Sequence, residues 1–204
     1  MTNPQPKPNN LMRLNRLFFA SLAIATLLLG GCSKQEAGAP ATAGKREVSV
    51  QAVAAEAKGF TVGALMSAQT AYVFFDPQCP HCGHLWQASL PLHKKVKFVW
   101  IPVAWIHASS LTQGAALLTA SNPTALMTEH EASLLAGRGG ISAPASVASD
   151  VEQSIKVNTK LLNSLGAESV PFIVVKNAAT GQTIAKDGAQ TTAALAEMIG
   201  IDPS

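Results

Sequence analysis

Short apolar runs, separated by turn residues, predict the strands of a sheet. A run of about four to eight apolar residues between turn signals is typical of a buried strand. The first such run covers residues 71–75 and is followed by Asp76-Pro77, a pair that favours a turn. Three further strands are expected, at residues 97–103, 171–176 and 182–186.

Helical periodicity and capping residues predict helices between these strands. Pro80 suits the first position of a helix that Pro91 should stop. In residues 149–165, apolar side chains recur at helical spacing, and Gly166 offers a C-terminal cap. The other predicted helices cover residues 109–121, 123–137 and 191–199.

The segment between residues 45 and 70 is ambiguous. Val48, Val50 and Val53 hint at a strand, and residues 59–63 at a turn or a short strand. We expect no separate domain in this segment.

The N-terminal pattern predicts an exported protein. Three basic residues precede an apolar run at residues 17–29, which is short for a membrane span and typical of a signal peptide. The run ends in Leu29-Gly30-Gly31-Cys32, which resembles the lipobox of bacterial lipoproteins, with Cys32 as the lipidated residue. Ser33 resembles a signal for sorting to the outer membrane. A plain secretory signal, cleaved after residues 41–43, remains the alternative.

These patterns divide the chain into three parts. Residues 1–31 are expected to be the signal peptide. Residues 32–59 are expected to form a flexible tether and N-terminal extension, because residues 33–44 are rich in Gly, Ala, Pro and Gln. Residues 60–204 are expected to form the globular domain.

Composition is consistent with one globular domain that does not bind nucleic acid. The chain has 204 residues, of which 48% are hydrophobic, and a formal net charge of +3. The leader holds Lys7, Arg13 and Arg16 and no acid, so 15 − 3 = 12 bases remain against 12 acids. A nearly neutral mature chain has no electrostatic basis for binding nucleic acid.

The candidate chemistry lies in Cys79-Pro80-His81-Cys82, directly after the first strand. A helix that begins at Pro80 places Cys79 at its N-terminus and Cys82 one turn further, on the same face. Partial positive charge and free N–H groups at a helix N-terminus favour a thiolate, and His81 can add a donor or a cation. We therefore expect a lowered pKa for Cys79. An acidic thiol leaves readily, so a disulfide between these cysteines should be oxidising.

The same residues leave other interpretations open. Two cysteines at this spacing could form half of a zinc site or a small structural disulfide, although a second cysteine pair is absent from the sequence. Cys79, Cys82 and His84, together with His81, could also form a copper or zinc site. Asp76 could relay a proton to Cys82, but we favour a turn role.

Other candidate residues receive structural interpretations. His93, His107 and His130 are isolated, so we expect them at the surface and assign them no role. Four aromatic residues are expected to belong to the core: Phe74, Phe75, Trp86 and Trp100.

The order of elements is typical of a thioredoxin-like α/β fold, in which helices flank a central mixed sheet, here with a helical insertion. Several stretches are similar to the catalytic domain of periplasmic disulfide proteins of the DsbC and DsbG type, and DsbG is the closer match. The resemblance covers roughly residues 60–200. It is carried by residues 72–82, Trp86, residues 121–123, Asn158, Lys160, Leu161 and residues 165–167.

This resemblance implies a thiol:disulfide oxidoreductase that acts on cysteines of exported proteins. It implies catalytic roles for Cys79, Cys82, His81 and Pro80. By the same match, Pro171 is a cis-proline that faces the cysteines, and Val170 binds substrate. A trans proline that opens an edge strand is the alternative.

Two departures from the family change the expectation. Only about 40 residues separate Cys32 from Tyr72, so the family's dimerisation domain is expected to be missing or reduced. In addition, Pro80-His81 and Val170 resemble the oxidase DsbA more than DsbG. We therefore expect a monomeric oxidase or reductase rather than an isomerase. It should need no cofactor or metal, work with a membrane redox partner and contact the membrane through its lipid anchor.

Overall fold

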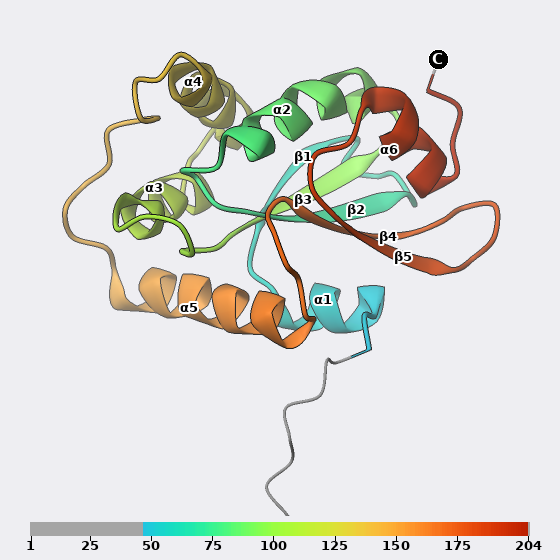
Figure 1. Cartoon of the computed structure of the whole chain (residues 1–204), viewed down its shortest axis with the longest axis horizontal. Coiled ribbons are helices and arrows are strands. Elements are labelled where there is room, and N and C mark those ends of the chain that lie inside the picture. The colour runs from blue at the N-terminus through green and yellow to red at the C-terminus, as the bar shows by residue number, and fades with distance from the viewer. Residues whose placement is uncertain (1–46, 204) are drawn as a thin grey trace, which may run out of the picture. The chain divides into compact units, whose positions relative to one another are not determined.

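The computed structural model describes residues 47–203, which form one five-stranded mixed sheet flanked by helices (Figure 1). The order of strands in the sheet is β1-β3-β2-β4-β5. Strand β2 pairs parallel with β3 and antiparallel with β4, while β1 and β5 form antiparallel edges. The strands are β1 (Phe60–Gly63), β2 (Thr70–Phe75), β3 (Lys97–Pro102), β4 (Phe172–Lys176) and β5 (Thr183–Asp187).

Helices cover both faces of this sheet. In Figure 1, α2 and α6 lie on one side of the sheet, and α1 and α5 lie on the other. Helices α3 and α4 form the predicted helical insertion after β3, and α4 packs against α2. The helices are α1 (Val50–Glu56), α2 (Pro80–Ser89), α3 (Ser109–Leu118), α4 (Pro123–Leu135), α5 (Ser149–Ser164) and α6 (Thr192–Ile199), with a short 3-10 helix at Leu90–Lys94.

Strand β2 is central because its sequence suits burial on both faces. Val73, Phe74 and Phe75 are fully buried, as a continuous apolar run in the middle of a covered sheet requires. The rings of Phe75 and Trp86 each contact Trp100 edge-on, at centroid distances of 5.5 and 5.2 Å. The expectation that these aromatic residues form the core is confirmed.

The segment before β1 differs from the expectation. The hint of a strand at Val48–Val53 is wrong, because residues 50–56 form helix α1, capped by the Ser49 side chain. Val53 is fully buried, and α1 packs against α5 and against strands of the sheet. Val50 and Val53, which favoured a strand, lie three residues apart and therefore share the side of this short helix that packs against the core. The folded domain therefore includes residues before residue 60.

Smaller differences concern the ends of helices. Helix α2 ends at Ser89, two residues before Pro91. The backbone then continues as a 3-10 helix, Leu90–Lys94, which has Pro91 in its first turn. Helix α3 ends at Leu118, three residues before the expected end.

The predicted signal peptide, the lipidation site Cys32 and most of the predicted tether lie outside the described residues. Within residues 47–203, none of the helices combines the length and apolar character needed to span a membrane.

Asn158 joins three parts of the fold. Its side-chain oxygen accepts the Lys58 N–H at 2.9 Å, and its amide nitrogen donates to the carbonyls of Lys58 at 2.7 Å and Pro102 at 3.0 Å. The side chain is fully buried, so these groups have little access to water. One amide therefore links α5 to the end of β3 and to the segment after α1.

We predict that Asn158→Ala lowers the free energy of unfolding by about 2–3 kcal/mol, because buried backbone groups lose their partners. Urea denaturation measures this change. The matched control is Asn163→Ala, an exposed asparagine of the same helix, which should change stability by less than about 0.5 kcal/mol. Equal losses in the two variants would contradict this account.

Candidate functional site

The loop between β2 and α2 is held by a buried carboxylate. The Asp76 side chain is fully buried and accepts hydrogen bonds from the Gln78 N–H at 2.8 Å and the Ser110 hydroxyl at 2.6 Å. Its other oxygen accepts the N–H groups of Trp105 at 2.7 Å and Ile106 at 2.9 Å. With four donors around it, Asp76 joins the loop after β2 to the loop after β3. This arrangement favours the turn role for Asp76.

Helix α2 begins at the cysteine pair, as predicted. Cys79 is the N-cap residue and Pro80 occupies the first turn. The Cys79 carbonyl accepts the Cys82 N–H at 2.9 Å, which closes the first turn of the helix. Cys79 is 4% exposed and Cys82 is fully buried, and both are free thiols. Cys79 is therefore slightly accessible to solvent, and Cys82 is not.

The surroundings of Cys79 stabilise its thiolate. The pKa of Cys79 is lowered to about 7, chiefly by a hydrogen bond from the Cys82 side chain. Burial opposes this shift, whereas the N–H groups of Cys82 and His81 and the charge of His81 add to it. The expected direction is confirmed. Burial is the largest cause that raises the pKa of Cys82 well above its usual value, followed by its contact with Cys79.

The loop before β4 approaches the same sulfur. The peptide bond between Val170 and Pro171 is cis, as the family resemblance predicted. The Cys79 thiol donates to the Val170 carbonyl at 3.3 Å. The Asp187 carboxylate accepts the N–H groups of Glu168 at 2.9 Å and Ser169 at 3.0 Å, and so anchors this loop to β5. Segments about 90 residues apart therefore meet at Cys79.

A cavity of about 470 Å³ opens beside Cys79. It lies between the start of α2, the loop after β3 and residues 168–170. Trp105 and Ile106 line it with apolar side chains that are 39% and 54% exposed. Cys79 thus borders a cavity whose wall is partly apolar.

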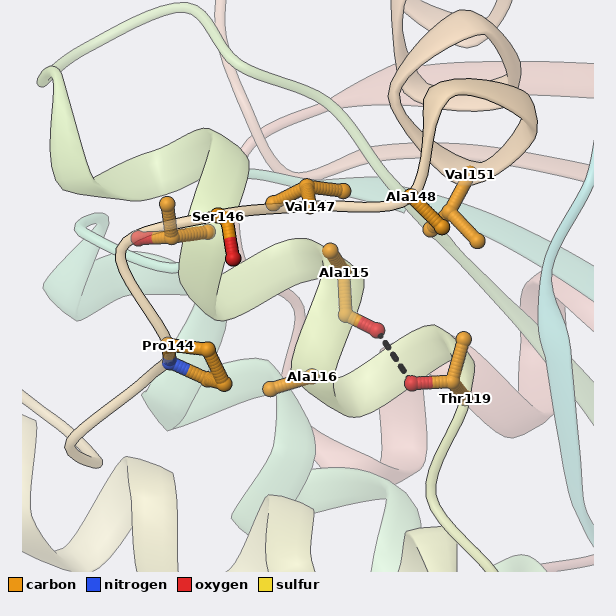
Figure 2. A pocket seen from close by; sticks show the side chains of 9 residues that line it. Ala115, Ala116, Thr119, Pro144, Ser146, Val147, Ala148 and Val151 are labelled. Atoms are coloured by element: carbon orange, nitrogen blue, oxygen red, sulfur yellow. Dashed lines mark hydrogen bonds between the residues drawn. The ribbon is translucent and has the colours of Figure 1, made fainter.

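A second cavity, of about 130 Å³, lies apart from the cysteines (Figure 2). Residues at and just after α3, Pro144, residues 146–148 and Val151 of α5 line it. The Thr119 hydroxyl donates to the Ala115 carbonyl at 2.9 Å on its wall. Its lining holds no ionisable side chain, so it offers no acid, base or nucleophile for chemistry.

The alternative metal site is not formed. Within residues 47–203, His, Cys, Asp and Glu side chains do not gather in any group of three or more that could hold a metal ion. His84 is exposed, whereas Cys82 is fully buried.

Two histidines differ from their expected place at the surface. His130 is fully buried, donates from Nε2 to the Pro77 carbonyl at 2.7 Å and accepts the Ile141 N–H at Nδ1 at 3.1 Å. Burial is the main cause that lowers its pKa. His93 is half-buried against the ring of Trp86, with centroids 5.4 Å apart. His107 is exposed, as expected.

Sequence reasoning also missed Glu131, which is only 1% exposed and lies on α4 close to α2. Burial raises the pKa of Glu131 to about 9, and the charge of Cys79 contributes to the shift. In the sequence, this residue follows Glu129 and His130 in a polar stretch that is typical of an exposed helix face. The pattern therefore contains no signal for its burial.

Comparison with curated proteins confirms the resemblance expected from the sequence. The chain is 33% identical to the thiol:disulfide interchange protein DsbG of Pseudomonas aeruginosa over 132 residues, which are 63% of this chain and 50% of the relative. It is 34% identical to DsbG of Escherichia coli over 104 residues, which are 50% of this chain and 41% of the relative. The chain thus spans about half or less of these relatives. No family model matches the chain.

Comparison with solved structures confirms the thioredoxin-like fold. A periplasmic thioredoxin-like protein from Salmonella enterica serovar Typhimurium aligns with a TM-score of 0.59 and 18% identity, covering 76% of this chain and 97% of that structure. The catalytic domain of Proteus mirabilis ScsC aligns with a TM-score of 0.56 and 16% identity, covering 73% and 95%.

We predict that Cys82→Ala raises the pKa of Cys79 by about one to two units, because a hydrogen bond to a charged group contributes about 1.5–3 kcal/mol. Cys82→Ser retains a hydroxyl donor and should keep the pKa nearer to about 7. Thiolate absorbance of the reduced protein as a function of pH measures both values, with Cys32 replaced by Ser. If the two variants titrate together at the wild-type midpoint, the Cys82 hydrogen bond is not the main cause.

Proposed function

We propose that the protein is a thiol:disulfide oxidoreductase that acts on cysteines of exported proteins through Cys79 and Cys82. The observation that carries this proposal is the asymmetry of the pair. Cys79 has a lowered pKa and lies at the edge of a cavity, while Cys82 is a fully buried thiol that donates to it. Such a pair can attack, or accept attack, at one sulfur and resolve the intermediate with the other.

The proposed reaction passes through a mixed disulfide. In reduction, the Cys79 thiolate attacks a substrate disulfide, and Cys82 then displaces the substrate to form the Cys79–Cys82 bond. In oxidation, a substrate thiolate attacks Cys79, the Cys79–Cys82 bond breaks, and a second substrate thiol releases the protein with Cys79 as the thiolate. The stabilised thiolate favours the steps in which Cys79 leaves.

Neighbouring residues have supporting roles in this proposal. Pro80 begins the helix, and His81 stabilises the thiolate through its N–H and its charge. Val170 and Pro171 bind an extended substrate segment through backbone groups beside Cys79, supported by the short contact of the Val170 carbonyl with the sulfur. The apolar wall at Trp105 and Ile106 favours substrates with exposed hydrophobic residues, such as unfolded chains.

We propose action as an oxidase or a reductase rather than as an isomerase, in a monomer that exchanges electrons with a membrane redox partner. Pro80-His81 and Val170 support this, because they resemble the oxidase DsbA. The reduction potential of the pair separates the two directions. Potentials on the order of −120 mV belong to strong oxidants and those on the order of −270 mV to reductants.

The proposed location is the periplasm, with a tether to the outer membrane through lipid on Cys32. The DsbG relatives and the periplasmic thioredoxin-like neighbour support an exported protein. The residues before Cys32 support lipidation, because they resemble a lipobox.

We predict that Cys82→Ser traps substrate proteins on Cys79, because the mixed disulfide forms but its resolving thiol is missing. Non-reducing electrophoresis of cell extracts should show high-mass adducts that a reductant releases. The double variant with Cys79→Ser is the matched control and should show none, since it lacks the attacking sulfur. Equal adduct levels with and without Cys79 would contradict the proposal.

We predict that Cys32→Ala abolishes incorporation of a labelled fatty acid and moves the protein from the membrane fraction to the soluble fraction. The reason is that Cys32 supplies the thiol that carries the lipid. Ser33→Ala is the matched control and should leave the labelling intact. Labelling that persists in Cys32→Ala would contradict the proposed anchor.

A further inference from the structure

The carboxylate of Glu131 lies against the residue that follows Cys82. A methyl group placed on Gly83 would come 2.7 Å from Oε2 of Glu131 and 3.1 Å from a carbon of Leu135. Gly83 therefore allows α4 to bring a carboxyl group onto the first turns of α2. Figure 1 shows these two helices side by side.

This carboxyl group has no hydrogen-bond partner. Both of its oxygens are buried without a donor or acceptor within reach, and the residue is 1% exposed. A buried polar group without partners costs free energy, and an ionised one costs more. The helix interface would be more stable with an apolar residue, so the position calls for a functional explanation.

Few other groups compete for a proton at this place. The titratable residues of α2 are His81, Cys82 and His84, and both histidines are exposed. Helix α3 and strand β1, which also pack against α4, contain none. On α4 itself, Glu129 is exposed, and both ring nitrogens of His130 are occupied by backbone partners.

Cys82 needs such a group, because its proton has no direct path to water. The thiol is fully buried, yet it must lose its proton before its sulfur can attack the mixed disulfide. Asp76 is already bound by four donors. Electrostatic coupling connects Glu131 with both Cys79 and Cys82.

We propose that Glu131 carries the proton of the Cys82 thiol during disulfide exchange, an inference that rests on the proposed function of the cysteine pair. It assigns to the helical insertion a part in the reaction, beyond its part in the fold.

During reduction of a substrate, the Cys82 proton passes to Glu131 and the electron pair of the cysteines passes to the substrate. In the mixed disulfide, Cys79 is bonded to the substrate and carries no charge, which makes Glu131 easier to ionise. Its carboxylate accepts the Cys82 proton, and the Cys82 sulfur bonds to the Cys79 sulfur. The bond between Cys79 and the substrate breaks, and its electron pair leaves on the substrate sulfur. The pair is oxidised and the substrate is reduced.

The reverse direction uses the same carrier. When a substrate thiolate attacks Cys79 in the disulfide, Cys82 leaves as a thiolate inside the protein. The Glu131 carboxyl group then gives it a proton, so Cys82 becomes a neutral thiol and the negative charge moves to the Glu131 carboxylate until that group takes up a proton from water.

A stopped-flow reaction with dithiobis(nitrobenzoate) separates the steps, in the full chain with Cys32 replaced by Ser. Attack by Cys79 releases the first thionitrobenzoate, and resolution by Cys82 releases the second. We expect Glu131→Gln to slow the second phase by about 10²-fold at pH 7, as loss of a general base does, and to leave the first phase within about twofold. The matched control is Glu129→Gln, which should match the wild type in both phases.

The pH profile of the second phase gives a readout that a merely structural role would not move. In the wild type, the rate should level off once Glu131 is ionised. In Glu131→Gln it should rise about tenfold per pH unit up to pH 9, since hydroxide then removes the proton from a thiol whose pKa is well above 9.

Two results would overturn the proposal. One is a second phase in Glu131→Gln with the rate and pH profile of the wild type. The other is a wild-type profile that still rises about tenfold per pH unit through pH 10, above the pKa of about 9 of Glu131, which decides the matter even if the variant does not fold. Failure of the proposed function looks different, because the wild type would then release no second thionitrobenzoate at any pH.

Discussion

The stabilisation of one thiolate at the start of a helix is the interaction on which the rest of the site depends. Cys79 keeps a pKa of about 7 in nearly dry surroundings only because donors replace the water that burial removes. The strongest of these donors is the partner thiol of Cys82, and the backbone N–H groups of the first turn add to it. Reactivity is therefore a property of the strand-to-helix junction as a whole. The sheet matters because it delivers this junction and the Val170 carbonyl to the same place.

The two cysteines place opposite demands on the protein. In the proposed exchange, the Cys79 sulfur must ionise readily, whereas the Cys82 thiol must keep its proton until a bond to the Cys79 sulfur can form. The same hydrogen bond lowers one pKa and raises the other, so the two demands are met together. The proton of the Cys82 thiol, which is fully buried, then has to be taken up by a group inside the protein. This is why the unpartnered carboxyl group of Glu131 on the insertion is of more than structural interest.

Features fixed by short stretches of sequence could be predicted, and features fixed by contacts between distant segments could not. Apolar runs and Pro80 located β2, α2 and the cysteine pair, because turns, caps and strand burial depend on neighbouring residues. The cis bond before Pro171 was foreseen only through a family resemblance. Helix α1 was missed because its valines suit either element, and packing against α5 decides between them. His130 and Glu131 lie in a polar stretch, and only the approach of α4 to Gly83 and Gly140 buries them.

The hydrogen bonds of Asp76 fix the backbone at Trp105 and Ile106 but leave their side chains unconstrained. One oxygen of this residue accepts the backbone N–H groups of Trp105 and Ile106. The apolar wall of the cavity beside Cys79 is therefore held through its main chain. The side chains at these two positions are free of that attachment. Under the proposed function, exchanging these side chains would alter which polypeptides bind, while Cys79, its lowered pKa and its hydrogen-bond partners would stay unchanged. Selectivity and reactivity are thereby separable, and evolution or an engineer could adjust one without disturbing the other.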